Sequence, residues 1–113
     1  GGRHNWNAVY GEEAPALEFL KSLAPKPRTK VGRLIDQLEL HGPDLPRPYA
    51  DVLRGKIREL RVPYGRLQIR CLYFFEDKHV VFLSGFFKKT RAVPEEEIAR
   101  AERRMTDWLE RRQ

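Results

Sequence analysis

The chain has 113 residues, of which 41% are hydrophobic, and a formal net charge of +6. This length suits a single domain, the composition excludes a disordered chain, and no apolar run approaches the roughly 18 residues that span a bilayer. We therefore expect a cytoplasmic protein without membrane contact, whose domain covers residues 5–113 and whose residues 1–4 are a cloning remnant. The single cysteine, Cys71, excludes an intramolecular disulfide and is expected to be a small buried side chain.

The first half of the chain predicts a strand and two helices. Residues 5–11, NWNAVYG, alternate in polarity and predict a short strand. Apolar residues at helical spacing then predict one helix within residues 12–25 and another over residues 27–41. Two successive amphipathic helices indicate a helical hairpin laid over a sheet. Residues 42–56 carry three prolines and two glycines, which favours an ordered loop.

The second half predicts three strands and a final helix. The strands are expected over residues 56–62, 66–75 and 79–87, and their short connections force them to be antiparallel. Pro94 and three acids then begin a helix that ends in arginines, with a stripe that includes Met105 and Trp108 expected in the core. The order β-α-α-β-β-β-α predicts an α+β fold with a mainly antiparallel sheet. We expect the helices on one face of the sheet and an open second face.

Positive charge is concentrated in the middle of the chain. Residues 54–91 hold ten lysines or arginines and three acids, a balance of +7, whereas the other residues sum to −1. A localised basic field attracts polyanions, of which nucleic acid is the commonest in a cell. A charged surface that serves only solubility is the alternative, but such surfaces usually mix both signs.

Alternation along the strands places several of these charges on one sheet face. Leu67, Ile69 and Tyr73 are expected to face the core, so the residues between them point the other way. Lys88 and Lys89 follow the last strand and lie at the rim of the same face. The predicted basic face consists of Glu59, Arg61, Arg66, Gln68, Arg70, Lys88 and Lys89.

Such a face suits both RNA cleavage and RNA binding. When a 2′-hydroxyl attacks the adjacent phosphate, negative charge builds up, and Arg61 and Arg70 could stabilise it without a metal or cofactor. Lys88, Lys89 or Glu59 could move the proton. Basic faces with one acid also occur in nucleic-acid binders that cleave nothing. The residues expected to contact RNA beside the reaction are Arg54, Lys56, Arg66, Gln68 and Arg91.

Three motifs occur in order: LRGKIRELRV, RCLYFF and HVVFLSGFFKKT. Together they resemble the RelE/ParE toxin superfamily and its phage-type HigB-like branch, whose members show L-R-x-x-(L/I)-x-E-L-R, R-x-L-Y-F and G-F-x-K-K-T. The resemblance runs from about Trp6 to the end of the chain and implies a RelE-like fold.

The resemblance implies a type II toxin that cleaves mRNA, commonly on the ribosome. Its partner would be a helix-turn-helix antitoxin, through which alone it would contact operator DNA. By motif position, Arg61, Arg70, Lys88 and Lys89 match residues that bind phosphate and stabilise charge in RelE-like nucleases. The chain departs from the RelE pattern because no tyrosine or histidine follows the two lysines in TRAVPEEEI. A ParE-like toxin that acts on gyrase and a non-catalytic nucleic-acid binder remain alternatives.

Overall fold

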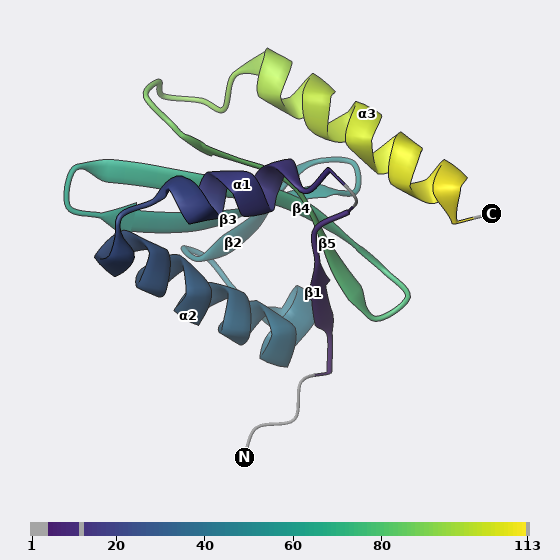
Figure 1. The fold of residues 1–113 in the computed structure, drawn as a ribbon, viewed down its shortest axis with the longest axis horizontal. Helices are drawn as coiled ribbons and strands as arrows, with labels where there is room; N and C mark the ends of the chain where they lie inside the picture. Colours follow the sequence, from purple (N-terminus) through teal and green to yellow (C-terminus); the bar gives the residue numbers. More distant parts are fainter. Residues whose placement is uncertain (1–4, 12, 113) are drawn as a thin grey trace.

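A computed structural model describes residues 5–11 and 13–112; the predicted cloning remnant, residues 1–4, lies outside them. The elements confirm the predicted α+β class (Figure 1). In chain order they are β1 (Asn7–Val9), α1 (Pro15–Ser22), α2 (Pro25–His41), the 3-10 turn η1 (Gly42–Asp44), β2 (Ala50–Arg54), β3 (Ile57–Tyr64), β4 (Leu67–Glu76), β5 (His79–Phe87) and α3 (Glu95–Arg111).

The five strands form one sheet in the order β1-β5-β4-β3-β2. Strands β2 to β5 are consecutive and antiparallel, as the short connections require, whereas β1 pairs with β5 in parallel. Gly55 and Gly65 have positive φ angles in the turns on either side of β3. Glycine accepts this backbone conformation without strain, which permits these tight connections.

The prediction of a loop over residues 42–56 was wrong in part, because this segment contains the edge strand β2. Its three prolines all precede the strand, so the backbone from Ala50 onward is free to pair with β3. Proline density hid the short alternating pattern of this strand, in which Ala50 and Val52 point to one face and Asp51 points to the other. The sheet therefore has one strand more than the sequence indicated.

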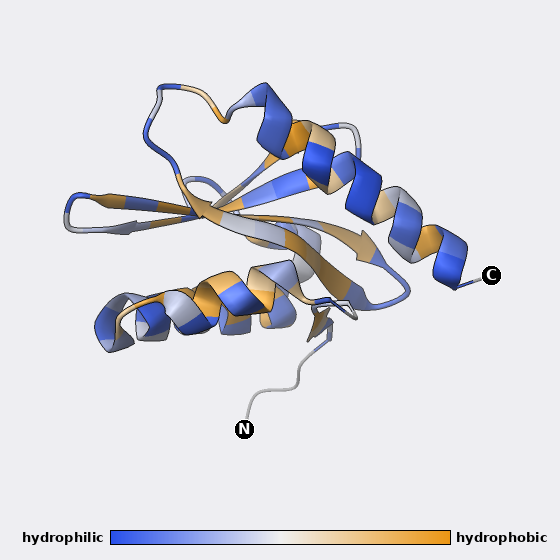
Figure 2. Ribbon diagram, turned by 45° about the horizontal axis from the view of Figure 1, so that its top comes forward, coloured by the Kyte–Doolittle hydropathy of each residue, from blue (hydrophilic) through white to orange (hydrophobic). Residues whose placement is uncertain are grey.

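The helices lie on both faces of the sheet, so the expectation of an open second face was also wrong. Figure 2 shows the sheet between the α1–α2 pair and α3. The α1–α2 side holds the larger apolar core, while α3 buries Ile98 and Ala101. Ala101 packs with Leu72 and Phe74, whose side chains make the α3 face apolar near the helix. This apolar area explains why the final helix covers that face.

The α1–α2 core follows the predicted pattern. Val31, Ile35 and Leu38 of α2 are buried, as their spacing required. Cys71 is fully buried at 0% exposure, and burial raises the pKa of its thiol to about 12. The expectation of a small core side chain there is confirmed.

Residue 85 must be small because α1 packs closely on β5. A Cβ atom added to Gly85 would lie 2.4 Å from the Phe19 ring. The same ring meets Phe87 edge-on at 5.2 Å between centroids. Gly85 therefore makes room for the helix residue that fixes α1 on the sheet.

Candidate functional site

Arg61 on β3 and Arg70 on β4 are direct partners across the two strands. Residues opposite each other in an antiparallel pair point to the same face, and here that face is the one that carries α3. Glu59, two residues before Arg61, shares this face. The structure therefore brings three of the predicted catalytic residues together.

Glu59 lies between the two arginines and is only 4% exposed. Its Oε1 accepts a hydrogen bond from Arg61 Nε at 2.6 Å. Its Oε2 faces Arg70 Nε at 3.7 Å, a separation that is too long for a hydrogen bond. Among the described residues, neither of these two facing atoms has another hydrogen-bond partner. The carboxylate thus compensates the charge of both guanidinium groups in a buried setting.

A second carboxylate, which the sequence reading missed, holds Arg61 from the other side. Asp51 of β2 places Oδ2 at 3.3 Å from an Arg61 terminal nitrogen and at 2.9 Å from Arg47 Nε. Desolvation acts to raise the pKa of Asp51, but hydrogen bonds from the Val52 amide and Arg47 bring it below its ordinary value. Asp51 was missed because it belongs to the unrecognised edge strand. Its alternation with buried Ala50 was the available signal.

Arg70 is buried, at 7% exposure, so the expectation of an exposed arginine was wrong. In the cross-strand row it lies between Arg61 and Phe86, the partner on β5. One terminal nitrogen donates to Gln68 Oε1 and to the Ile69 carbonyl, both at 3.3 Å. Burial lowers the pKa of Arg70, Glu59 opposes this change, and Arg61 adds to it. The arginine nevertheless keeps its charge, because guanidinium groups do not deprotonate in proteins.

The predicted lysine pair lies at the end of β5 beside this arginine row. The Lys88 amide donates to the Gln68 carbonyl at 2.7 Å and so continues the ladder between β4 and β5. This register puts Lys88 on the same face as Gln68 and Arg70. Lys89 is exposed next to it. Cations from β3, β4 and β5 therefore converge near one end of the sheet.

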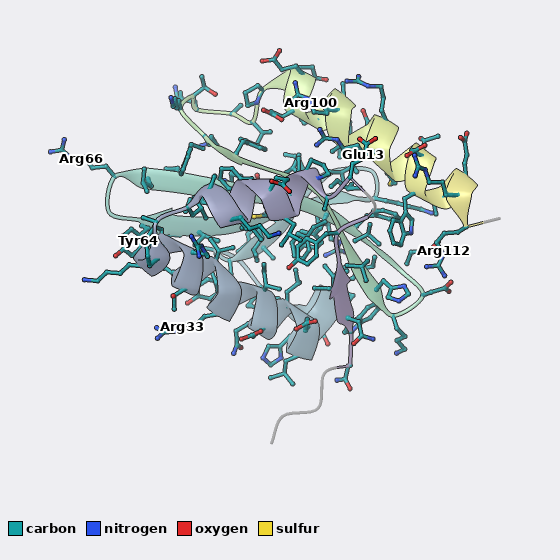
Figure 3. All side chains as sticks on the ribbon, in the orientation of Figure 1. Glu13, Arg33, Tyr64, Arg66, Arg100 and Arg112 are labelled. Atoms are coloured by element: carbon teal, nitrogen blue, oxygen red, sulfur yellow. The ribbon has the colours of Figure 1, made fainter. Side chains whose placement is uncertain are left out.

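The remaining predicted RNA contacts are divided between the two ends of the sheet. Arg66 is exposed in the β3–β4 turn, on the same end as the lysine pair, and is labelled in Figure 3. Lys56 lies in the β2–β3 turn at the opposite end, and Arg54 forms an ion pair with Glu95 at 2.5 Å. Arg91 is exposed in the segment before α3. Only part of the predicted set therefore borders the arginine pair.

Arg58 lies on the face of the sheet opposite to Arg61, because the two residues are three positions apart on β3. Its strand partner is Tyr73, which is buried in the α1–α2 core. Its guanidinium lies 5.4 Å from the centroid of the Phe75 ring. Arg58 therefore packs against an aromatic side chain and takes no part in the Arg61–Arg70 row.

The Arg61–Arg70 pair provides positive charge at fixed positions, whereas no described side chain beside it is clearly placed to act as an acid or a base. Arginine pairs bind phosphate oxygens through several parallel hydrogen bonds. Glu59 is buried and engaged with both arginines, which suits a residue that positions them. Within the described residues, no three His, Cys, Asp or Glu side chains are grouped to hold a metal ion. For the same part of the chain, no helix is long and apolar enough to cross a membrane.

Comparison with known proteins identifies first the class of fold and then the family. The chain is similar to a solved structure titled "Crystal structure of archaeal RelE-RelB complex from Pyrococcus horikoshii OT3", with a TM-score of 0.50 and 17% identity over 78% of this chain and 99% of that chain. At this identity the similarity shows a RelE-like fold. A family model described as "Phage derived protein Gp49-like (DUF891)" matches residues 18–106, and the chain belongs to this family. The resemblance to the RelE superfamily is thereby confirmed. None of the curated proteins matches the chain.

Proposed function

We propose that the chain is the toxin of a type II toxin–antitoxin pair and that it cleaves mRNA on the ribosome without a metal ion. The observation that carries this proposal is the side-by-side placement of Arg61 and Arg70, with Lys88 on the same face. Two guanidinium groups at fixed positions suit the charge that develops on a phosphate during attack by a 2′-hydroxyl. The reaction would take place in the cytoplasm, where ribosomes translate.

In this reaction Arg61 and Arg70 bind the non-bridging oxygens of the scissile phosphate. Their charge stabilises the phosphorane-like transition state more than the ground state, which is the requirement for catalysis. As the 2′-oxygen bonds to phosphorus and the bond to the 5′-oxygen breaks, Lys88 or Lys89 takes the proton from the 2′-hydroxyl and a proton passes to the departing 5′-oxygen, which leaves a cyclic phosphate and a free 5′-hydroxyl. Glu59 keeps both arginines in place and does not itself exchange a proton with the substrate.

An antitoxin is the partner that this proposal implies. The structural neighbour is a RelE chain solved in complex with RelB, which supports a protein partner for this chain as well. We expect the antitoxin to be a small helix-turn-helix protein encoded by an adjacent gene. Contact with operator DNA would occur only through that protein.

The proposal is tested by inducing the chain alone in a bacterial host and mapping mRNA ends by primer extension. We expect growth arrest, new cuts in translated mRNA, and recovery when the neighbouring gene is expressed. Normal growth with verified soluble expression would contradict the toxin assignment. Arrest without RNA cuts, together with inhibited DNA supercoiling by purified gyrase, would favour a ParE-like activity instead.

A further inference from the structure

A second basic surface lies on the α1–α2 side of the molecule, away from the Arg61–Arg70 row. It is a groove of about 420 Å³ between the first half of α2 and the end of β3. Arg33 and Tyr64, which are labelled in Figure 3, belong to its two walls. The lining residues are Pro25, Lys26, Thr29, Lys30, Arg33 and Tyr64. We call this surface the α2 groove.

The charges of α2 are separated along the helix in a way that stability does not explain. Its first half, residues 25–33, contains four cations and no acid, and its acids are Asp36 and Glu39. Cations in the first turns of a helix oppose the macrodipole and destabilise it. Arg28 has a structural contact, since it donates to the carbonyls of Lys21 and Leu23. Lys26 and Arg33 call for a different explanation.

Lys26 and Arg33 are exposed, and within the described residues neither has an ion pair or hydrogen bond. Lys30 is held differently, because its Nζ donates to the Pro63 carbonyl at the end of β3. This contact fixes α2 against the strand that carries Tyr64. The groove therefore has one wall with free cations and one wall with an aromatic ring.

The α2 groove and the lysine pair lie near the same end of the sheet, on its opposite faces. Pro63 pairs with Gln68 across β3 and β4, and the Gln68 carbonyl accepts the Lys88 amide. Arg66 projects from the turn between these strands, at the same end of the molecule as Arg33 and Tyr64 (Figure 3). A path of positive charge thus leads from the groove around the hairpin to the lysine pair.

We propose that the α2 groove binds the phosphate backbone of the single-stranded RNA whose neighbouring nucleotides reach Arg61 and Arg70. Free cations along a groove, with an aromatic ring on which a base can stack, are the features that hold single-stranded nucleic acid. A concave surface fits a flexible chain of phosphates better than it fits a flat anionic membrane. The inference rests on the proposed nuclease function for the identity of the RNA.

The test measures binding of a short fluorescent RNA oligonucleotide with 2′-O-methyl groups, which cannot be cleaved by 2′-hydroxyl attack. The double variant Lys26→Gln/Arg33→Gln should bind about tenfold more weakly at low salt than the parent, because it neutralises two fewer phosphates. The slope of log affinity against log salt should fall by about 0.7 for each phosphate that is no longer neutralised. Removing these cations should not destabilise α2, and a thermal melt verifies this.

Three further variants separate binding in the groove from the effect of overall charge. The double variant Arg103→Gln/Arg111→Gln removes the same charge from exposed positions on α3 and should bind as tightly as the parent. On the other wall, Tyr64→Ala should weaken binding about tenfold, whereas Tyr64→Phe retains the ring and should bind normally. These comparisons attribute the weaker binding to the groove itself.

The inference is overturned if Lys26→Gln/Arg33→Gln binds the oligonucleotide as the parent does, or if the α3 double variant is weakened equally. If the Lys26→Gln/Arg33→Gln variant loses the parent's binding to phosphatidylserine vesicles but binds RNA as the parent does, the groove is a membrane site instead. Because the probe is not cleaved, failure here is distinct from failure of the nuclease proposal. If the unmodified protein binds the oligonucleotide through the groove but cuts no mRNA, only the nuclease proposal is contradicted.

Discussion

Glu59 Oε2 and Arg70 Nε face each other at 3.7 Å, and neither atom is hydrogen bonded to another group in the described part of the chain. The other oxygen of Glu59 is already bound to Arg61. One buried carboxylate therefore sets the separation of two guanidinium groups. The first prediction concerns this carboxylate.

Replacing Glu59 by glutamine should reduce the proposed RNA cleavage about tenfold and leave the shape of its pH profile unchanged. A positioning residue acts through geometry, whereas loss of a general base would remove a limb of the profile. The free energy of unfolding should fall by on the order of 3 kcal/mol, because the buried Arg70 loses its counter-charge, whereas Arg61 keeps its ion pair with Asp51. Single-turnover cleavage across pH and urea unfolding measure the two effects.

Glu95→Gln is the matched control for Glu59→Gln. It also removes a carboxylate from an arginine ion pair, but Glu95 is exposed at the start of α3. Exposed ion pairs contribute little to stability, so this variant should unfold and cleave as the parent does. Loss of a pH-profile limb in Glu59→Gln alone would assign Glu59 to proton transfer and contradict the positioning role.

Arg70 and Arg58 provide a comparison between the two sheet faces. Arg70→Ala should slow cleavage roughly a hundredfold, equivalent to about 3 kcal/mol of transition-state stabilisation. Arg58→Ala should be nearly silent in cleavage, because Arg58 packs on Phe75 on the other face. Primer extension of mRNA from induced cells, together with growth curves, measures both.

Because Arg70 is buried, its alanine variant needs a check for folding. Arg70→Lys keeps the positive charge but loses the two-pronged geometry of the guanidinium, so we expect a folded protein with a strong loss of cleavage. Circular dichroism tests folding for each variant. A folded Arg70→Lys protein as toxic as the parent would rule out Arg70 as the phosphate clamp.

A pair of glycine substitutions tests the packing of α1 on β5. Gly85→Ala should destabilise the protein by about 1–3 kcal/mol, since the added methyl group meets the Phe19 ring. Gly32→Ala, in the exposed interior of α2, meets nothing within 4 Å and should stabilise the protein by up to about 1 kcal/mol. Urea unfolding of both variants is the measurement. Equal stability of the two would show that Phe19 does not occupy the space beside Gly85.

Cys71 should not react with thiol reagents while the protein is folded. Burial raises the pKa of its thiol to about 12, so little thiolate forms at neutral or mildly alkaline pH, and the reagent cannot reach it. Reaction with a chromogenic disulfide should be slow in buffer and fast in urea. Fast labelling in buffer, at the rate of a free thiol, would contradict its place in the core.

Sequence patterns predicted the α1–α2 hairpin, the three long strands and α3 because each of these has a clear apolar period. Alternation also placed Glu59, Arg61 and Arg70 on one face. Alternation did not predict the burial of Glu59 and Arg70, because burial depends on where α3 packs and a strand pattern contains no information about helix packing. Asp51 was missed for a related reason, since a short edge strand after several prolines has a weak local signal.

The parallel pairing of β1 with β5 has a consequence for the order of folding. β1 brings Asn7 beside His79, whereas β2 to β5 are joined by short turns whose closure costs little entropy. We expect the antiparallel strands to form early and β1 to join them last. Pulse-labelled hydrogen exchange would show this as late protection of the β1 amides, and simultaneous protection would contradict it. On a translating ribosome, β1 leaves the exit tunnel before every other strand of the sheet but can pair only after β5 has been synthesised.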